Sequence, residues 1–194
     1  AIAGAIVLLG LPGMVNTYLL FQASLVLVTA TAGLGLVLIM GWTGQIALAQ
    51  AGFLGVGAYG TTYLVAQGWP WPVAALAAAL LAAVFGVLIG LPVTRLRGFY
   101  LAIATLAFAE LMLRIFVEAK PITGGIAGVS VEPVVLPGLD ADASRWYLCL
   151  GLAVVATAAV ARIGVSGLGR RLRVVRDAEI AAPSLGLSPM RTKL

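Results

Sequence analysis

Long apolar stretches, separated by short clusters of Gly, Pro and polar residues, dominate the hydropathy pattern of the chain. A helix needs about 20 apolar residues, rising about 1.5 Å each, to cross a bilayer. By that length, membrane-crossing helices are predicted over residues 17–40, 46–66, 73–91, 99–117 and 146–163, with residues 1–11 as the remaining end of an earlier helix. We therefore expect about five or six spans, including the partial first helix.

Composition supports the same fold class. Hydrophobic residues make up 62% of the chain and charged residues only 10%, whereas soluble domains carry about 25% charged residues. Residues 1–94 contain no charged residue at all. Lipid must therefore be the solvent for this half, and we predict an all-α, multi-pass protein of a bacterial or archaeal plasma membrane. The transmembrane helix bundle is assigned to residues 1–165 and a cytoplasmic segment to residues 166–194.

The basic residues indicate which loops face the cytoplasm. Net charge is +5, but most of the cations lie directly beside apolar blocks, where cytoplasmic loops concentrate them, so nucleic-acid binding is not expected. The eight that do so are Arg95, Arg97, Arg170, Arg171, Arg173, Arg176, Arg191 and Lys193. The region 120–145, which holds four Gly and three Pro, is then predicted to be an extramembranous loop outside the cell.

Few residues offer catalytic or metal chemistry. The chain has no His and a single cysteine, Cys149, so it lacks the commonest base and a second thiol ligand. No Gly-x-Ser-x-Gly elbow is present, which argues against an intramembrane hydrolase. Lys120 and Lys193 are the only lysines, and neither follows a phosphate-binding glycine loop. We expect a protein that is not an enzyme and binds neither metal nor cofactor.

A helix interruption is predicted at residues 41–45, GWTGQ. Such a break leaves backbone polar groups that must face protein, water or substrate, and broken helices of this sort line binding sites. Thr43, Gln45 and Gln50 would then face a pathway. An ordinary turn at the membrane surface is the alternative.

Charged residues occur inside one predicted span. Glu110, Arg114 and Glu118 are spaced four apart and share one helix face. Glu110 lies about 17 Å from the start of that span, which is near mid-membrane. An ionisable group at that depth is by default a functional-site hypothesis. A structural pair between Glu110 and Arg114 is the alternative explanation.

Glycines in the run 55–60, GVGAYG, match a dinucleotide-binding fingerprint in letters only. That fingerprint requires a preceding strand and a later acidic residue, and neither is present. Close helix packing through small residues is the better explanation, and Gly86 and Gly90 repeat the pattern.

The C-terminal segment from Gly169 is amphipathic and charged. Its arginines alternate with apolar residues such as Leu172 and Val175, as in a helix lying on the membrane surface. A helix that docks onto a partner protein is the functional alternative.

Four motifs in sequence resemble one family. They are 41–45 with 48–59, then 97–108 (RGFYLAIATLAF), then 123–125 (TGG), and finally 176–182 (RDAEIAA) with 185–186. Together they resemble the branched-chain amino-acid ABC transporter permeases of the LivM type, over nearly the whole chain. With the residues of these motifs, the expected substrate pathway comprises Thr43, Gln45, Gln50, Tyr59, Thr105 and Glu110.

The resemblance implies a permease that pairs with a second permease subunit, receives substrate from an extracytoplasmic binding protein, and is driven by two ATPase subunits that bind the ATP and Mg²⁺. Its C-terminal segment is similar to a coupling helix for the ATPase. The residues that would fill this role are Arg176, Asp177, Glu179, Ala181, Ala182, Leu185 and Gly186. Pro183 departs from the family pattern, and we expect the docking helix to end or kink near Ala182.

Three matters stay open at this stage. The substrate is a branched-chain or similar small amino acid, with urea and short amides as alternatives within the same family. A secondary transporter that uses Glu110 and Arg114 as a proton or ion relay is the alternative mechanism. The chain has no initiator Met and no recognisable terminator, so we expect it to be incomplete at its C-terminus.

Overall fold

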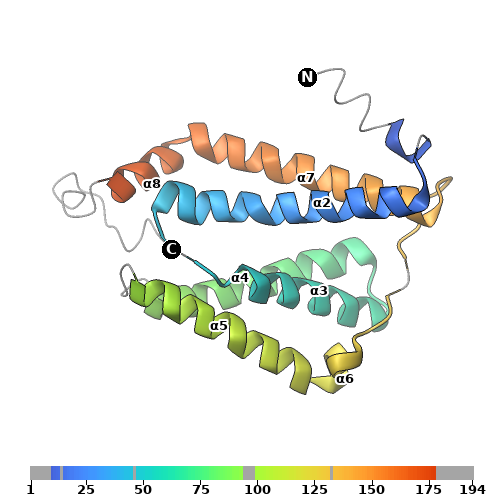
Figure 1. Ribbon diagram of the computed structural model, residues 1–194, viewed down its shortest axis with the longest axis horizontal. Coiled ribbons are helices and arrows are strands. Elements are labelled where there is room, and N and C mark those ends of the chain that lie inside the picture. The colour runs from blue at the N-terminus through green and yellow to red at the C-terminus, as the bar shows by residue number, and fades with distance from the viewer. Residues whose placement is uncertain (1–9, 14, 46, 94–98, 132, 178–194) are drawn as a thin grey trace. The chain divides into compact units, whose positions relative to one another are not determined.

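The computed structural model describes residues 10–13, 15–45, 47–93, 99–131 and 133–177 of the chain. Every regular element in these ranges is a helix, as the apolar pattern predicted (Figure 1). The longer helices are α2 (Thr17–Leu36), α3 (Gln50–Ala66), α4 (Trp71–Val93), α5 (Phe99–Glu118) and α7 (Ala141–Val165). The shorter ones are η1 (Leu11–Gly13), η2 (Val37–Trp42), α6 (Lys120–Thr123), η3 (Gly125–Ala127) and α8 (Gly167–Asp177).

Four stretches of the described residues are long and apolar enough to cross a bilayer. They are Thr17–Trp42, Trp71–Leu91, Phe99–Glu118 and Ala141–Val165. Their exposed surfaces are dominated by large apolar side chains, which only lipid or protein can cover. The chain is therefore a multi-pass, all-α membrane protein.

We infer that α3 also crosses the membrane. Helix α8 packs against η2 at the end of the first span, so these two elements lie on one side of the bilayer. Because α5 and α7 each cross the membrane once, α7 ends on the same side of the membrane as α4. Helix α8 follows α7 directly, so α4 also ends on the side of η2. Only a crossing by α3 lets α4 start on the opposite side. Its 17 residues reach about 26 Å, slightly less than the hydrocarbon thickness.

The four candidate spans and the inferred crossing by α3 make five crossings within the described residues. The expected partial helix at residues 1–11 falls almost wholly outside the described residues, so the full count stays a prediction.

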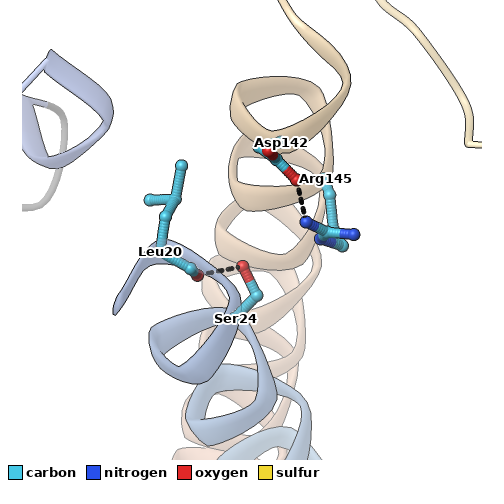
Figure 2. A network of polar contacts seen from close by, with 4 residues as sticks. All are labelled: Leu20, Ser24, Asp142 and Arg145. Atoms are coloured by element: carbon cyan, nitrogen blue, oxygen red, sulfur yellow. Dashed lines mark hydrogen bonds and ion pairs between the residues drawn. The ribbon is translucent and has the colours of Figure 1, made fainter. Parts of the chain in front are cut away.

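The chain divides into two compact units, which are described separately. One unit comprises Ala1–Gly35 and Glu132–Ile163, and so contains α2 and most of α7. Near the start of α7, Arg145 forms an ion pair with Asp142, and its guanidinium lies 5.0 Å from the centre of the Phe21 ring on α2. Figure 2 shows this ion pair beside the buried Ser24, whose hydroxyl donates to the Leu20 carbonyl at 2.8 Å. The contact between Arg145 and Phe21 joins α2 to α7 within the unit.

The expected loop over residues 120–145 is too long at both ends. Helices α6 and η3 occupy its first part, and α7 begins at Ala141 rather than near Trp146. The Asp140 carbonyl accepts the Ser144 N–H at 2.8 Å, which starts the helix early. An acidic side chain in the first turn, Asp142, also suits the positive end of the helix dipole. Polar residues at a helix start were thus mistaken for loop.

The second unit comprises Leu36–Val131 and Gly164–Leu194, and α3 is its central helix. Helix α3 packs against both α4 and α5 (Figure 1). On the α4 side, Gly60 lies against Ala78, and Ala74 and Ala78 are fully buried. On the α5 side, a buried apolar cluster joins the start of α3 to α5, and its members are Ala49, Val56, Phe108 and Met112.

Glycines make this close packing possible, as the sequence predicted. A Cβ at Gly52 would lie 3.1 Å from side-chain atoms of both Met112 and Phe108. A Cβ at Gly55 would overlap the Phe116 ring outright. Gly57 in the same helix faces open space, and Gly86 makes only an ordinary contact with Phe53 at 3.9 Å. The packing role therefore belongs to particular glycines and not to the whole run.

The TGG motif forms the turn after α5. The buried Thr123 hydroxyl lies within hydrogen-bonding distance of the Phe116 and Ala119 carbonyls, and it accepts the Gly125 N–H at 3.1 Å. Gly124 adopts φ of 71°, and a Cβ there would overlap the Gly128 carbonyl oxygen. The motif thus satisfies helix-end carbonyls and turns the chain where a side chain has no room.

Two alanine substitutions on one helix test the packing. Gly55→Ala forces the Phe116 ring to move, and overpacking of this kind costs about 1 to 3 kcal/mol. Gly57→Ala meets nothing and removes a flexible residue from a helix, which is neutral or stabilising by up to about 1 kcal/mol. Thermal unfolding of the purified protein in detergent should separate the two variants. Equal melting temperatures would contradict the assignment of Gly55 to the α3–α5 contact.

Candidate functional site

The predicted helix interruption exists but begins later than expected. The first span continues through Gly41 and Trp42 as the π-helical turn η2, and regular helix resumes only at Gln50. We refer to Gly44, Gln45 and residues 47–49 as the interrupted segment. Gly44 adopts φ of 68°, the left-handed conformation that ends many helices.

Backbone bonds close the helix before the interrupted segment. The Gln45 N–H donates to the Ile39 carbonyl at 3.2 Å, and the Thr43 hydroxyl bonds to the same carbonyl. This resembles the usual glycine-ended helix cap, widened because the last turn is π-helical. The half-buried Thr43 and Gln45 side chains lie together, with Thr43 Oγ1 3.4 Å from Gln45 Oε1. Two polar side chains of the expected pathway therefore meet at the break.

Thr105 holds the far end of the interrupted segment. Its hydroxyl oxygen accepts the Leu48 N–H at 3.0 Å and donates its own proton to the Ala102 carbonyl at 3.0 Å. The residue is only 5% exposed. Next along the chain, Ala49 is buried against Phe108 and Met112 of α5. The structure thus gives Thr105 a holding role, while its contact with substrate stays a prediction.

Of two other expected pathway residues, Tyr59 lies away from the break and Gln50 lies next to it. Tyr59 is ten residues further along α3 than Ala49, a rise of about 15 Å, and its ring centre lies 5.0 Å from that of Phe116. It therefore contributes to the contact between α3 and α5. Gln50 is half-buried at the start of α3, directly after the interrupted segment.

Glu110 occupies a different face of α5 from Thr105. The five-residue separation turns the helix by about 140°, so Glu110 is exposed, as are Arg114 and Glu118. The expected pair between Glu110 and Arg114 is not formed: among the described residues, ion pairs join Arg145 to Asp142 and Arg176 to neighbouring Asp177. Helical spacing allows such a pair but does not enforce it. A charged face near mid-membrane therefore lacks an ion-pair partner within the described part of the chain.

Helix α8 is the described part of the expected ATPase-coupling segment. It is amphipathic as predicted, with Gly169, Leu172 and Val175 buried and its arginines exposed. Arg176 and Asp177 end this helix. The other expected coupling residues, Glu179, Ala181, Ala182, Leu185 and Gly186, lie outside the described residues, as does Pro183.

Two arginines of α8 contact the end of the first span. The Arg176 Nη1 donates to the Gly41 carbonyl, and a Cβ at Gly44 would lie 3.1 Å from the Arg176 side chain. The Arg173 guanidinium lies 5.5 Å from the centre of the Trp42 ring. Sequence reasoning found Arg176 but missed Arg173 and Trp42, because only the folded chain brings α8 to η2. The sequence offered one sign of this contact: Arg173 and Arg176 are three residues apart and so lie on one face of the helix.

Replacing Thr105 tests how the segment is held. Thr105→Val keeps the shape but leaves the Leu48 N–H without its acceptor, which costs about 1 to 3 kcal/mol. Thr105→Ser keeps the hydroxyl and should retain most of the stability. Thermal unfolding in detergent should rank the variants Thr, Ser, Val in order of falling melting temperature. A valine variant that unfolds at the same temperature as the parent would contradict the holding role.

Comparisons with known proteins place the chain among permeases. A family described as branched-chain amino acid transport system / permease component matches residues 18–194. The chain is 35% identical, over 212 aligned positions, to the high-affinity branched-chain amino acid transport system permease protein LivM of Escherichia coli strain K12. It is 34% identical to the protein of the same name in Salmonella typhimurium strain LT2.

Each alignment covers 94% of this chain and 49% of the relative, so the chain spans about half the length of the curated relatives it matches. No solved structure matches it. The helical spans, the interrupted segment and the family match agree, and the chain belongs to the family of permease components of branched-chain amino acid transport systems.

Proposed function

We propose that the chain is part of the membrane-spanning permease subunit of an ATP-driven importer for branched-chain or similar small amino acids. An extracytoplasmic binding protein delivers the substrate, a second permease subunit completes the pathway, and partner ATPase subunits bind ATP with Mg²⁺ and hydrolyse it. The printed names of the two LivM relatives support the substrate class and the transport role. The permease itself carries out no chemical reaction on its cargo.

The observation that carries the proposal is the interrupted segment. Non-helical backbone at membrane depth is tolerated where it is enclosed by protein or lines a water-filled cavity. Here the segment is tied at Leu48 to α5, while Thr43 and Gln45 gather at its other end. Hydroxyl and amide groups suit the ammonium and carboxylate of an amino acid, and discontinuous helices bind such groups in other transporters. Thr43, Gln45 and Gln50 are the pathway residues that we favour.

The charged face of α5 supports the presence of a second permease subunit. Glu110 and Arg114 are exposed in this chain, and a charge facing lipid near mid-membrane costs several kcal/mol. Another subunit or an aqueous pathway between subunits would remove that cost. A partner surface along this face therefore explains charges that the chain does not pair internally.

Helix α8 supports coupling to ATPase subunits. It packs against η2 at the end of the first span, and its amphipathic pattern with exposed arginines is typical of a helix at the cytoplasmic surface of a membrane. Asp177 is exposed at its end, and the expected coupling residues continue beyond it.

Reconstitution in liposomes tests the function. The full-length permease, assembled with its second permease and ATPase subunits, should take up leucine only when both ATP and the leucine-loaded binding protein are supplied. Unlabelled isoleucine and valine should compete, whereas urea and acetamide should not. Uptake that needs only a proton gradient, without ATPase subunits, would favour the relay mechanism and contradict the proposal.

Charge reversal at Glu179 tests the coupling segment. Glu179→Arg should leave membrane insertion intact but abolish stimulation of ATP hydrolysis by the loaded binding protein, because the docking segment then presents the wrong charge. Asp140→Arg is a suitable control, since it reverses an exposed acidic residue just before α7, outside the coupling segment. Normal stimulation in the Glu179 variant would remove this residue from the coupling segment.

A further inference from the structure

Arginines of α8 contact backbone carbonyls at the ends of two different helices. The last four carbonyls of a helix have no partner within it and need another donor. Arg176 donates to the Gly41 carbonyl in the last turn of the first span, and Arg173 donates to the Gly164 carbonyl in the last turn of α7. Cations are also favoured there by the helix dipole. Helix α8 therefore supplies hydrogen-bond donors to the end of the first span and to the end of α7.

An aromatic contact strengthens the same junction. The Arg173 guanidinium lies 5.5 Å from the centre of the Trp42 ring, a distance at which cation–π attraction operates. The Trp42 ring also packs directly on Gly164, where an added Cβ would lie 2.9 Å from it. Arg173, Trp42 and Gly164 thus form one compact contact, which a larger residue at position 164 would disturb.

The junction lies directly beside the interrupted segment. Only Trp42 and Thr43 separate the Gly41 carbonyl from Gly44, where the segment begins. A Cβ at Gly44 would lie 3.1 Å from the Cγ of Arg176 and 3.9 Å from its Cβ. Any displacement of α8 at this end must therefore press on the backbone of the segment or pull on it.

We propose that Arg173 and Arg176 form a latch that transmits movement of α8 to the interrupted segment. The inference rests on the proposed function, in which ATPase subunits dock at α8 and beyond. It adds a route: α8, η2 and the start of the interrupted segment move as one body, so that ATP-driven displacement of α8 reaches Thr43 and Gln45. Both arginines are positioning residues and neither touches substrate.

Charge-matched variants test the latch. Arg173→Gln with Arg176→Gln removes both carbonyl donors and the cation–π contact. Arg170→Gln with Arg171→Gln removes the same charge from the same helix, at side chains that form no hydrogen bond or ion pair with described residues. In liposomes, leucine uptake per ATP hydrolysed should fall about 5- to 10-fold in the latch variant. The control should retain the parent ratio.

A reversible covalent latch covers the case in which the double glutamine variant does not fold. An added Cβ at position 44 would lie 3.9 Å from the Cβ of Arg176, a separation that suits a disulfide. Because the left-handed φ of Gly44 strains any other residue, the test uses double-cysteine protein that purifies in folded form. Gly44→Cys with Arg176→Cys, in a Cys149→Ser background, should therefore cross-link when oxidised with diamide. Uptake per ATP should be low in the reduced protein, which lacks Arg176, and should recover on oxidation and fall again with dithiothreitol. The single Arg176→Cys variant controls for oxidation of the partner subunits.

The outcomes separate the latch from the proposed function. A latch variant as well coupled as its control, or a cross-linked protein no better coupled than its reduced form, overturns the latch while the function stands. Failure of the cross-link to form overturns the geometry on which the latch rests. A parent transporter without ATP-driven leucine uptake overturns the proposed function and the coupling role together.

Discussion

The backbone of Gly44, Gln45 and residues 47–49 lies outside any helix, in a chain whose surroundings are mostly apolar. Water is scarce at such a place, so each N–H and C=O there needs a partner from the protein itself. The Gln45 N–H turns back to Ile39, and the Leu48 N–H reaches Thr105 on α5. The rest of the second unit is arranged so that these partners are in position.

Close packing of α3 and α5 is what brings Thr105 within reach. Gly52 and Gly55 allow Phe108, Met112 and Phe116 of α5 to approach the α3 backbone. Without a hydrophobic force between helices in lipid, such small residues set how near two helices come. The glycines therefore act on the site at a distance: they position the helix whose hydroxyl holds the interrupted segment.

The spans were predictable because bilayer thickness sets their length and lipid demands apolar side chains all round. The break was predictable because residues 41–45 interrupt the apolar pattern, but its true start at Gly44 was not predictable. A π-helical turn needs no special residue, so the apolar run through Trp42 carries no local sign of it. The start of α7 was missed because Asp142 and Arg145 are polar residues that stabilise a helix start.

Contacts between distant residues set the remaining limit. The spacing of Glu110 and Arg114 allows a pair, yet both side chains are exposed and neither forms an ion pair with another described residue. Tyr59 lies in a motif that resembles the family, but its ring packs on that of Phe116, 57 residues later in the chain. Arg173 reaches Trp42 only because α8 folds back onto η2. Such partners follow from the folded chain and not from any local pattern.

Thiol accessibility at position 45 tests the central claim, that the interrupted segment faces a pathway driven by ATP. Gln45→Cys would be placed in a Cys149→Ser background of the assembled transporter and exposed to a membrane-impermeant thiol reagent. Leu80→Cys, at a 68% exposed apolar position of α4, serves as the lipid-facing control. We predict that the thiol at position 45 is labelled in one nucleotide state and protected in the other, while the control is never labelled. Labelling that ignores nucleotide, or no labelling in either state, would contradict the account.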